Sequence, residues 1–136
     1  MTRAGDELPS WLRASLYATG AMNLAVGAAV GSGSDALLVR TGLPSPGSPF
    51  YTATVGLFIL LFGVGYLAAA ARGRDERLFL AFSGAGKLSF VALVTGLWGA
   101  GRLPARVPAL ALADLLFGAL FVGWCLTSGE KRRPRA

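Results

Sequence analysis

Charged residues are absent from long stretches of this chain, and their spacing constrains the fold more than any other feature. Four stretches carry at most one charged residue each: residues 14–34, 41–71, 78–101 and 107–129. Lys87 is the single charge in the third stretch, and Asp114 is the single charge in the fourth. A helix that crosses a bilayer needs about 20 mainly apolar residues. We therefore expect four membrane-spanning helices, at about residues 11–31, 50–71, 78–98 and 107–126.

The composition favours a membrane protein over a soluble bundle with an apolar core. The chain is 54% hydrophobic and 15% charged, whereas a soluble domain has about 25% charged residues. A soluble helix also carries a polar stripe, and none of the four stretches has one. The sequence thus predicts an all-α fold, an integral membrane four-helix bundle that forms a single transmembrane domain over residues 1–136. A cleaved signal peptide is the competing interpretation of the first span, and Asp6, Glu7 and Asn23 argue against it.

The connections between the spans predict the topology. Residues 32–49 form a long outer loop rich in Gly and Pro, whose middle can hold a short helix at residues 35–42. Residues 72–77 make a tight polar turn, and residues 127–136 form a basic C-terminal tail. Lys and Arg favour the cytoplasmic side of a membrane. Since most basic residues lie near the termini and in the tight turn, we expect both termini in the cytoplasm and a multi-pass protein of the bacterial inner (plasma) membrane.

Two smaller features predict where helices begin and end. Ser10 is a candidate N-cap for the first span, with Trp11 at the membrane interface. A turn containing Gly and Pro is expected over residues 99–108, between the third and fourth spans.

The residue types present exclude several kinds of chemistry. The chain has no histidine and one cysteine, Cys125, so an intramolecular disulfide, a CxxC redox pair and metal or haem sites built on imidazole are excluded. No motif for catalysis or cofactor binding is present, so we predict no catalytic residue, no metal site and no cofactor, and a non-enzymatic role is favoured. The net charge of +6 does not indicate nucleic-acid binding, because the basic residues lie at the ends of spans.

Three polar side chains lie near the middle of the predicted bilayer. At about 1.5 Å per residue, Asn23, Lys87 and Asp114 are roughly 14–18 Å from the cytoplasmic ends of their helices. Ionisable groups at this depth are costly and usually functional. Ser83 lies one turn before Lys87, and Tyr66 lies close to the small-residue face of the second span. These residues form the predicted site for ligand binding or proton relay: Lys87, Asp114, Asn23, Ser83 and Tyr66.

Two interpretations of this polar cluster remain open. Lys87 and Asp114 can form a structural ion pair, with Asn23 completing its hydrogen bonds. The same residues can instead form a polar binding point inside an apolar cavity. Because a buried ion pair seldom stabilises a protein more than an apolar core would, the second interpretation is favoured.

Small residues recur at the spacing that packs membrane helices. Gly27 and Gly31 fit the GxxxG motif, and Ala119 and Gly123 fit a looser version of it. On the second span, three small residues recur at heptad spacing: Gly56, Gly63 and Ala70. We expect these residues mainly to pack helices within the bundle, with contacts between subunits as the alternative.

The leading functional hypothesis is a non-enzymatic membrane protein that binds a membrane lipid or an apolar small molecule at this site. In this hypothesis Lys87 attracts an anionic or carbonyl group, Asp114 holds Lys87 in place, and Asn23 orients both. One alternative is an accessory subunit that packs against a membrane protein partner or forms a homo-oligomer. Another is a small proton-coupled transporter in which Asp114 cycles its proton.

Two short motifs resemble a known family. The stretch GAGKLSF at residues 84–90, followed one span later by ALADLLFGALF at residues 111–121, is similar to small four-span bacterial membrane proteins of the DoxX-like type. The resemblance covers the last two spans best. It implies an accessory or lipophile-binding role beside oxidoreductase or quinol-oxidising complexes. No catalytic residue of that family carries over, and without histidine any redox cofactor would belong to a partner.

Overall fold

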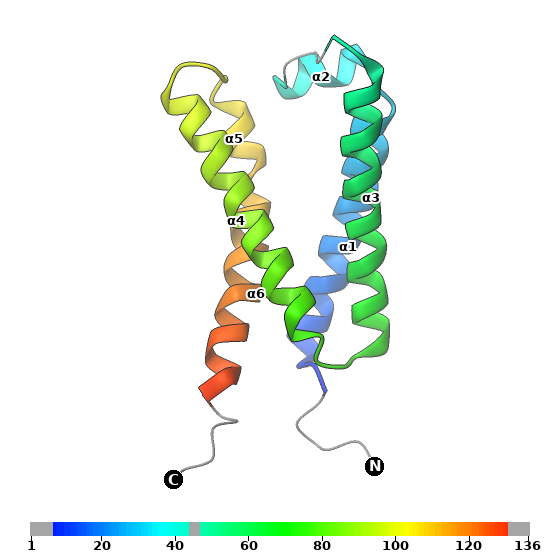
Figure 1. Cartoon of the computed structure of the whole chain (residues 1–136), viewed down its shortest axis with the longest axis vertical. Helices are drawn as coiled ribbons and strands as arrows, with labels where there is room; N and C mark the ends of the chain where they lie inside the picture. The colour runs from blue at the N-terminus through cyan, green and yellow to red at the C-terminus, as the bar shows by residue number, and fades with distance from the viewer. Residues whose placement is uncertain (1–6, 44–46, 131–136) are drawn as a thin grey trace. The chain divides into compact units, whose positions relative to one another are not determined.

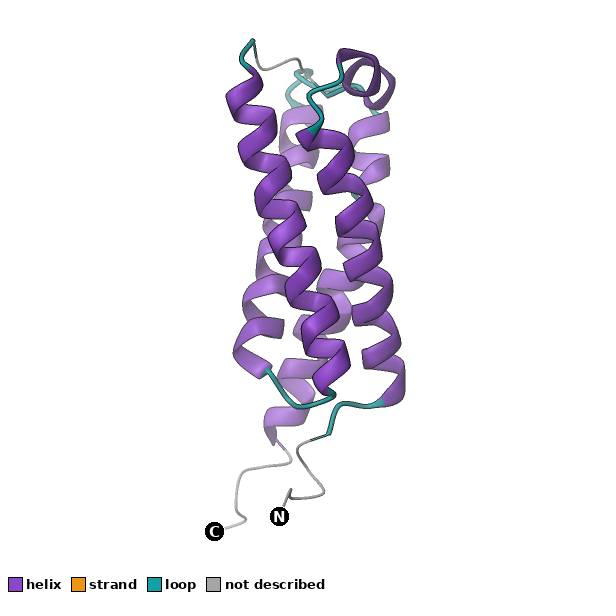
Figure 2. Cartoon of the chain, turned by 90° about the vertical axis from the view of Figure 1, so that its right-hand side faces the viewer, coloured by secondary structure: helices purple, strands orange, loops and turns teal. Residues whose placement is uncertain are grey.

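The computed structural model describes residues 7–43 and 47–130, and the fold within them is all-α (Figure 1, Figure 2). The described residues form six helices: α1 (Ser10–Gly31), α2 (Asp35–Thr41), α3 (Pro49–Arg72), α4 (Arg77–Gly99), α5 (Arg106–Leu110) and α6 (Leu112–Glu130). The chain divides into two compact units, Met1–Asp75 and Glu76–Ala136. Each unit contains two long helices with a short helix between them in sequence.

Local sequence explains where α2 ends and where α3 begins and ends. At the start of α3, the Ser48 hydroxyl accepts a hydrogen bond from the backbone N–H of Phe50 at 3.4 Å. Pro49 occupies the first turn, where its missing N–H is not needed. Both α2 and α3 end at a glycine with a positive φ, 79° at Gly42 and 63° at Gly73. This left-handed conformation satisfies the last helical carbonyls and favours glycine.

The start of α1 corrects one expectation. Ser10 was expected to cap the helix, but it is the first helical residue, and Pro9 stands at the N-cap position without a side-chain cap. The Pro9 carbonyl accepts hydrogen bonds from the backbone N–H groups of Leu12 and Arg13, both at 3.0 Å. The helix therefore begins on a main-chain carbonyl, and the Ser10 hydroxyl has no capping role.

The other boundaries follow the charge pattern closely. The first three expected spans match α1, α3 and α4 to within one residue at each end, and the expected short helix is α2. The expected turn at residues 99–108 is shorter in the structure, because α5 begins at Arg106 and includes Pro108. Predictions that rest on residues 1–6, 44–46 and 131–136, including most of the basic tail, lie outside the described residues.

In the first unit, α1 and α3 lie side by side as an antiparallel hairpin (Figure 1). Two hydrogen bonds join the beginning of α1 to the end of α3. Arg13 Nε donates to the Ala70 carbonyl at 3.1 Å, and the Leu8 N–H donates to the Gly73 carbonyl at 2.9 Å. Main-chain carbonyls at the end of α3 thus hold the beginning of α1 in place.

Glycines set how closely α1 approaches α3. A Cβ atom at Gly27 would lie 2.9 Å from the Leu60 nitrogen and 3.0 Å from the Gly56 carbonyl oxygen. A Cβ atom at Gly20 would lie 3.1 Å from the Gly63 carbonyl oxygen. Such contacts leave no room for a side chain, so the backbones touch. The small residues predicted to pack helices are confirmed at this contact: Gly27, Gly31, Gly56, Gly63 and Ala70.

In the second unit, α4 packs against α6. Arg77 Nη2 donates a hydrogen bond to the Cys125 carbonyl, and Cys125 Sγ donates to the Arg77 carbonyl at 3.7 Å. Further along, a Cβ atom at Gly84 would lie 3.2 Å from the Gly118 carbonyl oxygen. The second unit is therefore also an antiparallel pair of helices that cross at glycines.

The helix-packing prediction for Ala119 and Gly123 is wrong within the described residues. Both residues are exposed, and a Cβ atom at Gly123 would have no described neighbour within 4 Å. The buried face of α6 instead carries Gly118 and Phe121, and the latter side chain is 0% exposed. An apolar helix without a polar stripe does not reveal its rotation, which is why the spacing motif pointed to the wrong face.

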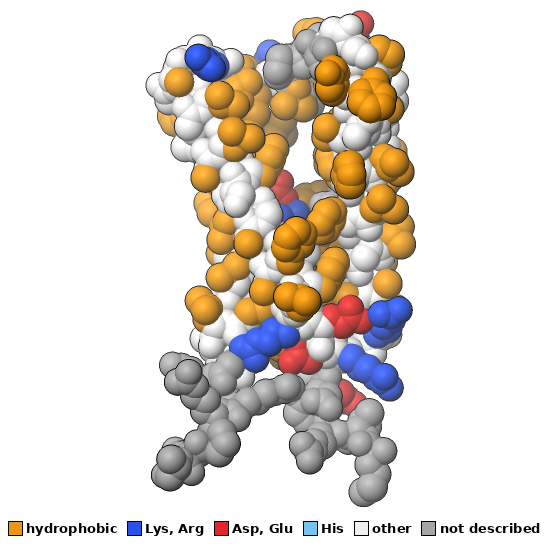
Figure 3. Space-filling view, viewed as in Figure 1, with side chains coloured by type: hydrophobic (Ala, Val, Ile, Leu, Met, Phe, Trp, Pro, Cys, Tyr) orange, Lys and Arg blue, Asp and Glu red, His pale blue; other side chains and the backbone are white. Residues whose placement is uncertain are grey.

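Two helices, α3 and α4, are long and apolar enough to cross a membrane by length and composition. The segment Leu112–Ser128 of α6 is apolar and shorter. In the space-filling view, hydrophobic side chains cover the flanks of the long helices, and in the first unit charged side chains gather where α1 begins and α3 ends (Figure 3). Each of these long helices therefore presents apolar side chains outward.

Candidate functional site

Lys87 on α4 and Asp114 on α6 form an ion pair between Lys87 Nζ and Asp114 Oδ1. The Lys87 side chain is 8% exposed, and the Asp114 side chain is 23% exposed. An isolated buried charge is strongly unfavourable, and pairing with an opposite charge reduces that penalty. The structure thus brings together the two charges that interrupt the apolar stretches. The Asp114 side chain is the more exposed of the two.

The glycine crossing explains why these two side chains meet. Gly84 lies one turn before Lys87 on α4, and Gly118 lies one turn after Asp114 on α6. Because the backbones touch at these glycines, the short carboxylate side chain and the lysine ammonium come within contact distance just beyond the crossing.

The helix changes conformation immediately before Asp114. Ala111 separates α5 from α6, with a ψ of −4° instead of the helical value of about −42°. Its N–H donates to the carbonyls of both Val107 and Pro108, at 3.2 and 3.1 Å. Asp114 therefore falls in the first turn of α6, where the exposed N–H groups of a helix favour a negative charge.

A buried hydroxyl lies one turn from the ion pair on the same helix. Ser83 is 2% exposed, and its Oγ atom has no hydrogen-bond partner among the described residues. A buried hydroxyl without a partner costs about 1–3 kcal/mol in protein mutational data. Ser83 thus offers an unused donor and acceptor beside the two charges.

Other helical hydroxyls in the chain behave differently. Several donate to a main-chain carbonyl three or four residues earlier, the usual solution for Ser and Thr in a helix: Ser15, Thr41, Thr52 and Thr127. Thr19, in the first unit, resembles Ser83 instead. It is 0% exposed, and its Oγ1 atom has no hydrogen-bond partner among the described residues. Thr19 was not among the site residues predicted from the sequence.

The remaining predicted residues, Asn23 and Tyr66, belong to the first unit. Asn23 on α1 is 9% exposed, and a Cβ atom at Gly63 would lie 3.2 Å from its Cβ. Tyr66 on α3 is 1% exposed, and its ring centroid lies 6.4 Å from that of Phe62. Both side chains are therefore buried polar groups of the α1–α3 hairpin. That Asn23 orients the Lys87 pair stays a prediction.

The two units repeat one sequence pattern. In the first long helix of each unit, TGAMNL at residues 19–24 corresponds to SGAGKL at residues 83–88. In the second long helix of each unit, the tetrapeptide LLFG occurs at residues 60–63 and again at residues 115–118. These segments contain the glycines at which each helix pair crosses.

The contacts repeat together with the sequence. The equivalent residues that make the same kind of contact in the two units are Arg13 and Arg77, Gly20 and Gly84, Gly63 and Gly118, and Tyr66 and Phe121. The aromatic centroids are 6.4 Å apart for Phe62 and Tyr66, and 6.3 Å apart for Phe117 and Phe121. We call the two copies the first hairpin (α1 to α3) and the second hairpin (α4 to α6).

The two hairpins differ where the ion pair lies. With LLFG aligned, Asp114 corresponds to Ile59, and with the first helices aligned, Lys87 corresponds to Asn23. The first hairpin therefore forms the same glycine crossing and the same arginine contact with two uncharged residues at these positions. The repeat could have been detected in the sequence from the second LLFG and from the shared pattern around Gly20 and Gly84.

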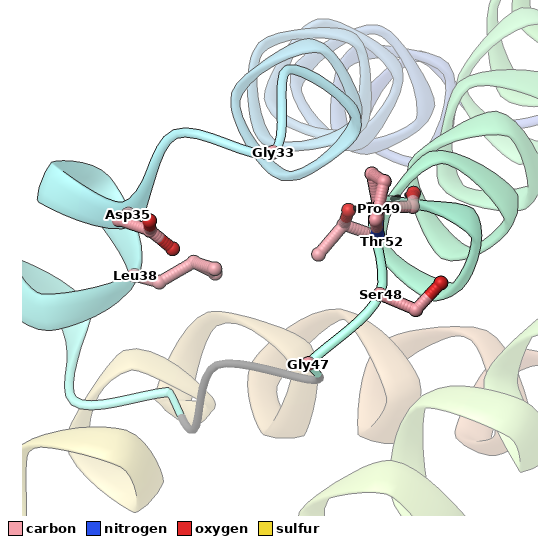
Figure 4. Close-up of a pocket in the computed structure, with 7 residues that line it drawn as sticks. All are labelled: Gly33, Asp35, Leu38, Gly47, Ser48, Pro49 and Thr52. Carbon is pink, nitrogen blue, oxygen red and sulfur yellow. Dashed lines mark hydrogen bonds between the residues drawn. The ribbon is translucent and has the colours of Figure 1, made fainter.

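A separate pocket of about 280 Å³ lies in the first unit, between α2 and the start of α3 (Figure 4). Its lining residues are Gly33, Asp35, Leu38, Gly47, Ser48, Pro49 and Thr52. The Thr52 hydroxyl already donates to the Pro49 carbonyl at 3.0 Å, and Ser48 caps α3. The polar groups here serve helix ends, so this pocket is not the site predicted from the apolar stretches.

The arrangement around Lys87 can bind and orient a polar group. No cluster of three or more possible metal-ligating His, Cys, Asp or Glu residues occurs in the described part of the chain.

No protein-family model, no curated protein and no solved structure matches the chain. The similarity to DoxX-like proteins therefore stays a prediction from two short motifs.

Proposed function

We propose that the chain is a non-enzymatic four-span membrane protein that binds the polar head of a lipid or apolar small molecule at Lys87, Asp114 and Ser83. In this proposal both termini face the cytoplasm and the protein lies in the plasma membrane. Ligand binding at this site does not require a protein partner, because the second hairpin itself supplies all three side chains.

Exposed apolar side chains support four spans rather than two. Beyond α3 and α4, large hydrophobic residues of α1 and α6 also face outward: Trp11, Tyr17, Val26, Leu112, Leu115, Leu116 and Leu126. Exposing such side chains to water on every long helix is unfavourable. At about 1.5 Å per residue, the 22 residues of α1 are about 33 Å long, and a bilayer core is about 30 Å thick.

The positions of basic residues support the orientation. In the first hairpin, Arg13 near the start of α1 and Arg72 at the end of α3 lie at the same end of the helix pair, whereas Arg40 lies on α2 between the long helices. In the second hairpin, Arg77 begins α4 and the sequence after α6 is basic, whereas Arg102 and Arg106 lie between the two long helices. Basic residues at the ends near the chain termini favour a cytoplasmic location for those ends.

One observation carries the binding proposal. The first hairpin makes the same glycine crossing with Asn23 and Ile59 at the positions of Lys87 and Asp114. Helix packing alone therefore does not require an ion pair at this place. Because charged residues in a membrane helix are costly and rarely serve packing, their presence in the second hairpin supports a role in binding.

The exposures suggest how a ligand would be held. The Asp114 side chain is more exposed than the Lys87 side chain, so a donor on the head group, such as a hydroxyl or an amine, would approach Asp114. An acceptor on the same head group, such as a carbonyl or phosphate oxygen, would take the Ser83 hydroxyl and the positive field of Lys87. An amphiphile whose head both donates and accepts hydrogen bonds fits this pattern best.

Native mass spectrometry of protein extracted with its surrounding lipid tests the proposal. The informative variant combines Lys87→Asn with Asp114→Ile, which gives the second hairpin the residues of the first. We expect a discrete adduct on the wild type that the folded double variant lacks. Equal adducts on both proteins would refute a ligand site at the ion pair.

A second candidate function rests on a different surface. Ala119 and Gly123 form a small-residue face on α6 that is exposed in the structure. Faces of this kind allow close helix packing in membranes, which supports an accessory subunit that packs against a partner helix. Cross-linking of an Ala119→Cys variant in native membranes would detect that partner, and an unlinked monomer would rule against it.

A further inference from the structure

The first hairpin contains its own pair of buried polar groups, at the positions equivalent to Ser83 and Lys87. Thr19 is 0% exposed and Asn23 is 9% exposed. They lie one turn apart on α1 and therefore on the same face. Gly63, on the opposite helix, lets the α3 backbone approach the Asn23 side chain closely, because a Cβ atom at Gly63 would lie only 3.2 Å from the Asn23 Cβ.

The Thr19 hydroxyl is not satisfied in the way that other helical hydroxyls are. Ser15, four residues earlier on the same helix, donates to the Trp11 carbonyl at 3.0 Å. Thr19 Oγ1 makes no hydrogen bond within the described residues, although it is buried. Ser83, its equivalent in the second hairpin, shows the same behaviour. A buried polar group without a partner is unfavourable, and the usual resolution is a bound water or ligand.

We propose that the first hairpin carries a second binding site, formed by Thr19 and Asn23, for the uncharged hydrogen-bonding head of an apolar molecule. Asn23 offers a donor and an acceptor through its amide, and Thr19 offers both through its hydroxyl. Neither residue carries a charge, so an alcohol or a carbonyl group is matched and a phosphate or an ammonium group is not. The site is formed by residues of the first hairpin alone, and its test does not depend on the outcome of the test of the Lys87 site.

The repeat accounts for a difference in ligand class between the two sites. Each hairpin places a hydroxyl residue directly before its crossing glycine and a polar residue one turn later. In the second hairpin that polar residue is Lys87, balanced by Asp114, so the site accepts a charged or strongly polar head. In the first hairpin the corresponding residues are Asn23 and Ile59, so the site accepts a neutral head.

Photolabelling of the full chain in membranes tests the second site. The probe is a long-chain alcohol with a diazirine beside its hydroxyl, added to vesicles of ether-linked phosphatidylcholine, which has no ester carbonyl. Labelled residues are mapped by mass spectrometry of peptides. We expect labelling of the helix turns around Asn23 that falls at least about tenfold when Thr19→Val is combined with Asn23→Leu, because two hydrogen bonds to the probe are lost.

Matched variants separate this site from the first and from a folding defect. Thr19→Ser, which introduces the residue of the second hairpin, should preserve labelling near Asn23. Ser15→Ala removes a hydroxyl that is already bonded within the helix and should have no effect. The Lys87→Asn, Asp114→Ile double variant should keep the labelling near Asn23, so failure of the Lys87 site and failure of this site give different results.

The lipid composition identifies the natural occupant. If ester-linked phosphatidylcholine suppresses labelling near Asn23 relative to ether-linked lipid, the occupant is a lipid ester carbonyl. Equal labelling in both membranes indicates an alcohol-bearing small molecule. Labelling near Asn23 that is unchanged in the Thr19→Val, Asn23→Leu variant, or that is uniform along the lipid-facing surface, would overturn the proposal.

Discussion

Replacing the ion pair by the residues of the first hairpin should leave the protein folded, whereas breaking the pair should not. Lys87→Asn alone leaves the Asp114 carboxylate partly buried without the opposite charge of Lys87. Asp114→Ile alone leaves the Lys87 ammonium buried without the opposite charge of Asp114. Removing one partner of a buried ion pair costs about 3–5 kcal/mol of unfolding free energy. The loss should be smaller when Asp114 is left, because it is 23% exposed, than when Lys87 is left at 8% exposed.

The double variant should recover most of this loss. Replacing a whole buried pair by uncharged residues is often neutral or stabilising, and Asn23 with Ile59 already occupies the equivalent positions of the first hairpin. We expect the double variant to lie within about 1 kcal/mol of the wild type, which gives an interaction energy of about 5 kcal/mol or more between the two positions.

A double-mutant cycle measures these values directly. The four proteins are unfolded in mixed detergent micelles by increasing the fraction of denaturing detergent, and helix content is followed by circular dichroism. The reverse exchange, Asn23→Lys with Ile59→Asp in the first hairpin, serves as a matched control. Asn23→Lys alone should destabilise that hairpin, and the added Asp should restore part of its stability.

One result would refute the reasoning about the repeat. If the Lys87→Asn, Asp114→Ile protein is as unstable as the sum of its single variants, the two positions have no interaction energy, and each residue is needed for stability on its own. The equivalence of the two hairpins would then not extend to these positions. The binding proposal would lose its main support, because packing would explain the charges.

Three further predictions concern packing and hydrogen bonding in the hairpins. Gly27→Ala should destabilise the protein by about 1–3 kcal/mol in the same unfolding assay, because the new methyl group meets backbone atoms. In the control Gly123→Ala, the new methyl group meets nothing within 4 Å, so this variant should be neutral or slightly stabilising. Equal losses in the two variants would contradict the assigned helix faces. Thr19→Val should leave the unfolding free energy in ligand-free detergent unchanged or higher, because the buried Thr19 hydroxyl has no hydrogen-bond partner among the described residues. In contrast, Thr52→Val should lower the unfolding free energy by about 1 kcal/mol, because it removes a hydrogen bond. A marked loss for Thr19→Val would indicate that its hydroxyl has a partner within the protein. Arg77→Met removes a charged donor to a carbonyl of α6, worth about 1.5–3 kcal/mol, and should speed amide hydrogen exchange in the last turns of that helix while leaving exchange in α1 unchanged.

Much of the secondary structure could be predicted because charge marks helix ends in an apolar chain. The ends of α1, α3 and α4 fall within one residue of the expected spans. The predicted cap at Ser10 is wrong because the Pro9 carbonyl accepts the hydrogen bonds of the first turn. A residue's capping preference does not show which group caps the helix.

The candidate site was predictable only in part. Lys87 and Asp114 stand out because each is alone among apolar residues, and the structure pairs them. Thr19 does not stand out, because a hydroxyl residue in a helix normally bonds to its own backbone, and its missing partner is visible only in three dimensions. The contrast between Gly118 and Gly123 likewise depends on helix rotation, which an evenly apolar sequence does not specify.

The repeat has an evolutionary consequence. In the proposed membrane topology each hairpin crosses the membrane twice, so a tandem copy has the same orientation as the original, and duplication of such a gene would preserve topology. A symmetric dimer of single hairpins must carry identical residues at equivalent positions. Once the copies are joined in one chain, each can acquire its own residues, and only then can one copy hold Lys87 and Asp114 while the other keeps Asn23 and Ile59.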